Sequence, residues 1–144
     1  MTKIRENLYL GSWNSAKPEE LKKNGITAVL DVAFDTQIAY FEYHHEPLVY
    51  HPDEFRRVSI NLGDYQDNKP YMKDLAIQTL KAMLYNGEKV LVHCVAGASR
   101  SVYVVVRLLS ELEGRSYHDV FEEIQKLRPI GLLGPMEGPL FANK

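Results

Sequence analysis

The sequence contains a single cysteine and no long apolar run, and both absences narrow what the chain can be. Cys94 has no second thiol with which to form an intramolecular disulfide, and one cysteine excludes a cysteine-rich metal site. The apolar runs are far shorter than a membrane span, and residues 1–6 lack the apolar core of a signal peptide. We therefore expect a cytoplasmic protein in which Cys94 is either buried filler or a reactive thiol.

An excess of basic charge is also missing. The chain has 17 Lys and Arg against 19 Asp and Glu, which gives a net charge of −2. Without an overall positive charge, we expect neither a nucleic acid nor a membrane as a partner. The hydrophobic fraction of 45% and charged fraction of 25% are typical of soluble globular proteins. With no internal repeat or linker in its 144 residues, the chain is predicted to form one domain over residues 1–144.

Turn signals divide the chain into short apolar runs and amphipathic segments that alternate. Strands are indicated by β-branched or alternating residues, and helices by apolar spacing with a proline or serine near the start and a glycine, asparagine or proline at the end. The predicted strands are residues 7–10, 26–32, 58–62 and 88–93, and the predicted helices are residues 17–24, 70–85, 102–113 and 116–128. Residues 35–57 fit neither pattern.

This alternation predicts an α/β fold with a central, mainly parallel sheet of about four to five strands flanked by helices. On the helix 70–85 we expect Leu75 on the buried face, and we expect Arg56 and Arg57 to be solvated residues that precede the strand 58–62. Ligands of such sheets bind beyond the carboxyl ends of the strands. The end of the strand 88–93 is therefore the first place to look for a site.

Directly after that strand the chain reads His93-Cys94-Val95-Ala96-Gly97-Ala98-Ser99-Arg100-Ser101. Its small residues let backbone N–H groups and the following helix N-terminus surround a tetrahedral oxyanion. Arg100 adds a planar guanidinium that can donate to two phosphate oxygens. The same positive field favours the thiolate of Cys94. An activated nucleophile and a phosphate-binding loop therefore coincide.

The segment resembles the signature of the cysteine-dependent protein tyrosine phosphatases, His-Cys-x5-Arg-Ser/Thr, and in particular that of the small dual-specificity phosphatases. Residues 8–12, 25–31 and 87–94 and the pair Arg128-Pro129 also resemble landmarks of this family, in the family's order. The resemblance implies a phosphatase-like three-layer fold and the hydrolysis of phosphotyrosine, and of phosphoserine and phosphothreonine, in proteins. It implies a phosphorylated protein or peptide as partner, no cofactor and no metal, and we favour a monomer.

The same resemblance assigns roles to the loop. Cys94 would attack the phosphoryl group to form a cysteinyl-phosphate intermediate, while Arg100 and the loop residues 95–99 hold the phosphate oxygens. Ser101 would donate a hydrogen bond to the departing thiolate. His93 would orient the loop without touching the substrate.

A general acid must protonate the leaving oxygen, and in the family this acid is an aspartate roughly thirty residues upstream of the cysteine. Asp64 lies thirty positions before Cys94 and follows the run 58–62. Asp67 is in the same segment, three residues further on. We favour Asp64 because it lies nearer the end of the predicted strand.

Two other functions remain open. The first is a phosphatase for a non-protein phosphomonoester such as a phosphoinositide or an RNA 5′ end, which the uncharged loop residues Val95, Ala96, Ala98 and Ser99 disfavour. The second is a catalytically idle phosphate-binding module, disfavoured because nucleophile, arginine and acid are all present. For His44, His45, His51 and Asp53, a solvated loop is favoured over a metal site because their spacing matches no ligand pattern.

Overall fold

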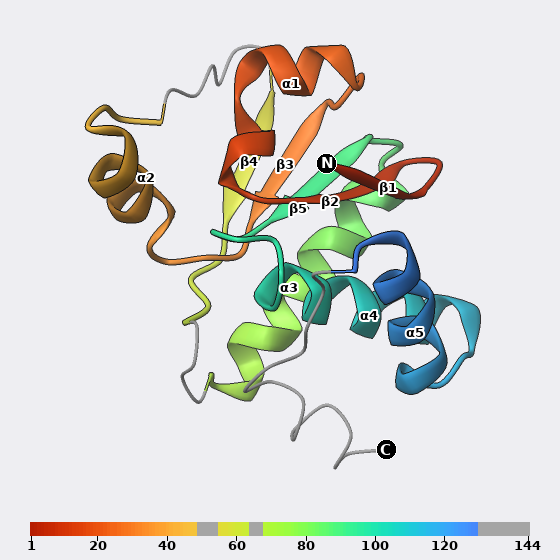
Figure 1. Ribbon diagram of the computed structural model, residues 1–144. Coiled ribbons are helices and arrows are strands. Elements are labelled where there is room, and N and C mark those ends of the chain that lie inside the picture. The colour runs from red at the N-terminus through yellow and green to blue at the C-terminus, as the bar shows by residue number, and fades with distance from the viewer. Residues whose placement is uncertain (49–54, 64–67, 130–144) are drawn as a thin grey trace.

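The computed structural model describes residues 1–48, 55–63 and 68–129. Within these residues, five strands form one sheet in the order β1-β2-β5-β3-β4 (Figure 1). Strands β2, β5, β3 and β4 run parallel to one another, and β1 pairs antiparallel with β2. The predicted mainly parallel sheet is therefore confirmed. The strands are β1 (Thr2–Arg5), β2 (Leu8–Gly11), β3 (Ala28–Asp31), β4 (Arg56–Ser59) and β5 (Val90–His93).

Helices cover both faces of the sheet, which gives three layers (Figure 1). One face packs on the 3-10 turn η1 (Trp13–Ala16) and α1 (Pro18–Lys23), through a core that includes Tyr9, Val29 and Leu91. The alternate residues of the same strands, such as Leu10, Leu30 and Val92, belong to the larger core on the other face. The helices of that face are α3 (Pro70–Tyr85), α4 (Arg100–Glu113) and α5 (Tyr117–Leu127).

Helix α4 is the central helix of the larger core and contacts α3, α5, β2 and β5. Residues 102–106, four valines and Tyr103, are all buried, so these β-branched and aromatic side chains fill the core from a helix rather than from a strand. Gly114, with φ +63°, adopts the left-handed conformation that ends α4, as the sequence predicted. At the start of α5, the Ser116 hydroxyl accepts from the Asp119 N–H at 3.0 Å, which confirms the predicted cap.

Besides the 3-10 turn η1, one strand and one α-helix of the described residues were not predicted. Strand β1 is short and carries charged residues, and it forms by pairing with β2. Helix α2 (Thr36–His44) lies in the stretch that matched no pattern. Its exposed side chains include Ile38 and Phe41, so it lacks the apolar stripe that identifies a surface helix from sequence.

The predicted strand 58–62 and the predicted face of the helix 70–85 were partly wrong. Strand β4 is Arg56–Ser59, because it pairs with β3 from Ala28↔Arg56 to Asp31↔Ser59. Within it Arg56 is exposed, but Arg57 turns inward and donates to Asp31 at 3.1 Å. On α3, Leu75 is 48% exposed and Ile77 is buried instead.

No helix in the described ranges is long and apolar enough to cross a lipid bilayer.

Candidate active site

The strand register brings four strand ends to one edge of the sheet. Gly11 and Asp31 both pair with His93, and Ser59 pairs with Asp31. The segments that follow β2, β3, β4 and β5 therefore leave the sheet close together. Residues 94–99, which join β5 to α4, lie at this edge, as predicted for a site beyond the carboxyl ends of the strands.

Cys94 is the first residue after β5 and is 2% exposed. Its Sγ atom lies 3.3 Å from Oγ of Ser101, a fully buried residue in the first turn of α4. Ser99 occupies the N-cap position of α4, so the loop of residues 94–99 leads directly into the N-terminus of the helix. The positive end of α4 therefore faces the loop that holds the thiol, where it can stabilise a thiolate or a bound oxyanion.

Gly97 sets the curvature of this loop. Its φ of +70° lies in the left-handed region, and an ideal Cβ there would lie 2.4 Å from the Gly11 carbonyl oxygen. Arg128 lies on the same side and donates from Nε to the Gly97 carbonyl at 2.8 Å, and from Nη1 to Oγ1 of Thr2 at 3.0 Å. Burial lowers the pKa of Arg128, while the nearby Cys94 raises it. The loop is thus held between the end of β2 and the C-cap of α5.

Two further backbone hydrogen bonds fix the loop to the sheet edge. The Trp13 N–H donates to the Val95 carbonyl at 3.0 Å, and the Val32 N–H donates to the His93 carbonyl at 2.9 Å. These two bonds and the contacts of Gly97 tie the loop to the ends of β2, β3 and α5.

Arg100 is 3% exposed and is the first residue of α4. Its Nη1 donates to Oδ1 of Asp35 at 2.8 Å and to the Leu62 carbonyl at 2.9 Å. Its Nε is buried and has no hydrogen-bond partner among residues 1–48, 55–63 and 68–129. A buried N–H without a partner is costly, so this edge of the guanidinium is suited to an incoming anion.

His93 is fully buried at the end of β5. Its Nδ1 lies 3.0 Å from the Cys94 carbonyl, which can only accept, so Nδ1 carries the proton. Burial lowers the pKa of His93 below its ordinary value of 6.5, although Asp31, 4.0 Å away, opposes the shift. The imidazole is therefore neutral near pH 7, and its bond to the Cys94 carbonyl orients the residue that carries the thiol.

The structure thus brings together His93, Cys94, Arg100 and Ser101 around the loop residues 95–99. The proposed acid Asp64 and its alternative Asp67 lie outside the described residues. Asp35 was not identified from the sequence as a site residue, and Arg128 was identified only as a family landmark. The one sequence signal for Asp35 is its position shortly after the strand of residues 26–32, at the edge where ligands bind.

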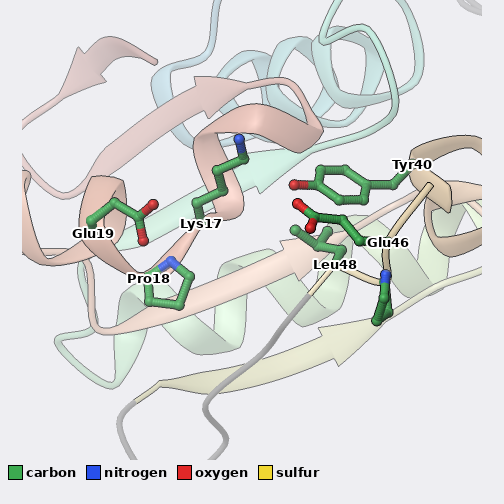
Figure 2. A pocket seen from close by; sticks show the side chains of 7 residues that line it. Lys17, Pro18, Glu19, Tyr40, Glu46 and Leu48 are labelled. Atoms are coloured by element: carbon green, nitrogen blue, oxygen red, sulfur yellow. The ribbon is translucent and has the colours of Figure 1, made fainter. Parts of the chain in front are cut away.

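A separate cavity of about 360 Å³ lies between α1 and the end of α2 (Figure 2). Side chains of both charges line it: Glu46 and Lys17 lie on the side of the Tyr40 ring, and Glu19 lies on the other side, next to Pro18 (Figure 2). None of its lining residues belongs to the loop of Cys94. Among the described residues, no three metal-ligating side chains come together; His51 and Asp53 lie outside those residues.

Comparison with known proteins identifies what this geometry is similar to. Residues 8–135 match the family model of the dual specificity phosphatase catalytic domain. Over 137 residues the chain is 30% identical to dual specificity protein phosphatase 15 of Mus musculus, covering 94% of this chain and 53% of that protein. It is 33% identical over 131 residues to protein phosphatase Slingshot of Drosophila melanogaster, covering 88% of this chain and 11% of that protein.

A solved structure resembles the whole chain. The crystal structure of human tyrosine phosphatase-like serine/threonine/tyrosine-interacting protein superposes with a TM-score of 0.79 at 25% identity, covering 100% of this chain and 98% of that chain. By contrast, the chain spans about half the length of the mouse relative, at 53%.

Proposed function

The chain belongs to the dual specificity phosphatase family, and from this premise we propose that it hydrolyses phosphotyrosine, and phosphoserine and phosphothreonine, in proteins. The observation that supports the proposal is the thiol of Cys94 at the positive end of α4, a helix whose first residue, Arg100, is buried and has an Nε without a hydrogen-bond partner among the described residues. A dianionic phosphoryl group bound in the loop would accept a hydrogen bond from that N–H while the sulfur attacks its phosphorus. The proposal takes residues 1–144 as one catalytic domain and the protein as a cytoplasmic monomer.

The reaction has two steps. The Cys94 thiolate attacks phosphorus, the bond from phosphorus to the substrate oxygen breaks, and Asp64 gives that oxygen its proton. Arg100 and the N–H groups of residues 95–99 hold the other three phosphoryl oxygens through the transition state. Asp64, now ionised, takes a proton from the water that attacks the cysteinyl-phosphate. Phosphate leaves, and the Ser101 hydroxyl donates a hydrogen bond to the departing thiolate.

Hydrolysis of para-nitrophenyl phosphate tests the nucleophile. We expect wild-type turnover, and we expect Cys94→Ser to abolish it while inorganic phosphate still binds, as calorimetry would detect. Ser110→Ala, a change at a buried residue of α4 outside the loop of Cys94, is the control and should retain turnover. Turnover by Cys94→Ser at the wild-type rate would contradict the mechanism.

The pH dependence of kcat/KM tests the acid. A bell-shaped profile reports one group that must be ionised and one that must be protonated. Asp64→Asn should remove the limb on the basic side of the bell, whereas Asp67→Asn should keep it. The opposite result would assign the acid to Asp67.

A non-protein phosphomonoester remains the second candidate substrate. Loop residues Val95, Ala96, Ala98 and Ser99 carry no charge that would bind the additional phosphates of an inositol ring. We therefore expect phosphotyrosine peptides to be turned over with higher kcat/KM than phosphoinositides or RNA with a 5′ phosphate. A parallel assay of the three classes decides between them, and lack of turnover on all would leave a phosphate-binding module.

A further inference from the structure

Asp35 occupies the N-cap position of α2 but does not cap the helix. An aspartate at this position ordinarily accepts a hydrogen bond from an N–H of the first turn. Here the side chain makes no such bond, and its Oδ1 instead accepts from Nη1 of Arg100 at 2.8 Å. The local preference of the residue is thus overridden by a contact with a residue 65 positions away. Departures from local rules of this kind are concentrated at functional sites.

The contact determines which edge of the guanidinium is left for a ligand. Nη1 of Arg100 donates to two acceptors, Asp35 and the Leu62 carbonyl. The N–H of Nε and one N–H of Nη2 point together toward the opposite edge, and this pair binds two oxygens of a phosphate. Nε is buried without a partner, as expected for an edge prepared for a ligand.

The turn that carries Asp35 is itself fixed. Oδ1 of Asp31, a 2% exposed residue, accepts from the Ala33 N–H at 3.0 Å and from the Thr36 hydroxyl at 2.9 Å. The Phe34 N–H donates to the Leu62 carbonyl at 3.3 Å. These bonds hold both sides of Asp35, so its carboxylate is a fixed support for Arg100.

We propose that Asp35 is a positioning residue that holds Arg100 in the orientation that binds the phosphoryl group in the transition state. The inference rests on the proposed function, because it assumes that Arg100 binds that group. Asp35 acts through Arg100 and does not contact the substrate. The negative charge of Asp35 also repels a bound phosphate. Removal of the Asp35 carboxylate therefore weakens binding of the transition state more than it weakens binding of the ground state.

Asp35→Asn and Asp35→Ser test this role. Both remove the charge and both are good N-cap residues. Because Nη1 of Arg100 keeps the Leu62 carbonyl as an acceptor, we expect both variants to fold, and their melting temperatures measure the stability that the lost contact contributed. We expect kcat for para-nitrophenyl phosphate and the affinity for orthovanadate to fall together by roughly 10- to 100-fold, the range for a misplaced catalytic group. The affinity for inorganic phosphate should change by less than about threefold. Loss of the carboxylate loosens Arg100, which weakens phosphate binding, but it also removes a negative charge that repels the phosphate.

Asp74→Asn is the matched control. Its carboxylate also accepts from an arginine, Arg107, at 3.1 Å, but it is 62% exposed and lies on α3. We expect its kcat and its orthovanadate affinity to equal those of the wild type.

A double-mutant cycle separates positioning from a general structural effect. In an Arg100→Ala background there is no guanidinium to hold, so adding Asp35→Asn should change kcat/KM by less than about threefold. Two results would overturn the proposal: an Asp35→Asn variant with wild-type kcat, or an equal loss in both backgrounds. If only one of the two Asp35 variants folds, that variant carries the test.

The outcome for Asp35 is distinguishable from the outcome for the proposed function. Absence of turnover by the wild-type protein would contradict the phosphatase proposal. The role of Asp35 could still be tested in that case, by comparing the orthovanadate affinities of Asp35→Asn and wild type by calorimetry. Wild-type turnover with unchanged Asp35 variants would contradict the role of Asp35 alone.

Discussion

The Gly11 carbonyl oxygen occupies the space into which a side chain at Gly97 would project. An ideal Cβ at Gly97 would lie 2.4 Å from that oxygen and 2.5 Å from Nη2 of Arg128. The contact joins the end of β2 to the middle of the loop around Cys94. Because the obstructing atom is backbone, the loop can accept a side chain there only by moving.

Gly97→Ala should therefore lower kcat by much more than its effect on the free energy of unfolding would suggest. Moving the loop by about 1 Å misplaces its N–H groups, and a shift of this size can cost on the order of 100-fold in kcat. Gly114→Ala is the control, because Gly114 has φ +63° with no atom within 4 Å of its ideal Cβ. It should lose about 1 kcal/mol in the free energy of unfolding and no activity. Similar activity of the two variants in a para-nitrophenyl phosphate assay would contradict the expectation.

Ser101→Ala should slow the second half of the reaction. The Ser101 hydroxyl lies 3.3 Å from the Cys94 sulfur, and a hydrogen bond to a charged group contributes about 1.5–3 kcal/mol, or roughly 10- to 100-fold in rate. Loss of that bond should make breakdown of the cysteinyl-phosphate rate-limiting. Stopped-flow measurement should then show a burst of para-nitrophenol followed by a slow steady state. A slow rate without a burst would place the effect in the first step instead.

The fold was largely predictable where one face of an element is apolar. Helix α5 and strand β5 carry patterns that depend only on their own residues, so their bounds were close to those observed. Helix α2 is held differently: Gln37 bonds to the backbone of Leu48, and Tyr40 packs edge-on against Trp13 at 5.5 Å. Such contacts join segments that are separate in sequence, and no local pattern encodes them. The bounds of β4 depend on its pairing with β3, for the same reason.

The residues of the candidate site also fall into those that a local sequence pattern predicts and those that only the fold brings together. The loop residues and Arg100 are contiguous, so a short motif was sufficient to find them. Asp35 reaches Arg100, and Arg128 reaches Gly97, only because strands and helices bring distant segments to one edge of the sheet. Their side-chain types alone, an aspartate before a helix and an arginine after one, are equally consistent with solvated residues.

Arg128→Gln should weaken the loop without removing the nucleophile. Two hydrogen bonds are lost, to the Gly97 carbonyl and to Thr2, and each contributes about 1 kcal/mol. We expect kcat/KM for para-nitrophenyl phosphate to fall roughly tenfold, with the larger part in KM if the loop loses order before the substrate binds. Arg56→Gln is the control, because that arginine is 78% exposed and pairs with Glu88 at the edge strand β4. Equal effects of the two substitutions would argue against a role in the loop.

His93 should make the stability of the protein depend on pH below neutrality. Burial lowers the pKa of His93 in the folded state, whereas the unfolded chain returns it to about 6.5. Below about pH 6.5 the unfolded chain therefore binds a proton that the folded protein does not, and the free energy of unfolding falls by up to about 1.4 kcal/mol per pH unit. Above that pH the contribution of this group is constant.

Urea unfolding of wild type and His93→Gln between about pH 5 and pH 8 compares the protein with and without that imidazole. The variant should show the smaller slope below about pH 6.5 and a parallel curve above it. His118→Gln removes a ring that is 66% exposed on α5 and should keep the wild-type slope. Equal slopes in wild type and His93→Gln would mean that the imidazole takes up its proton in the folded state, and its bond to the Cys94 carbonyl would then survive acidification.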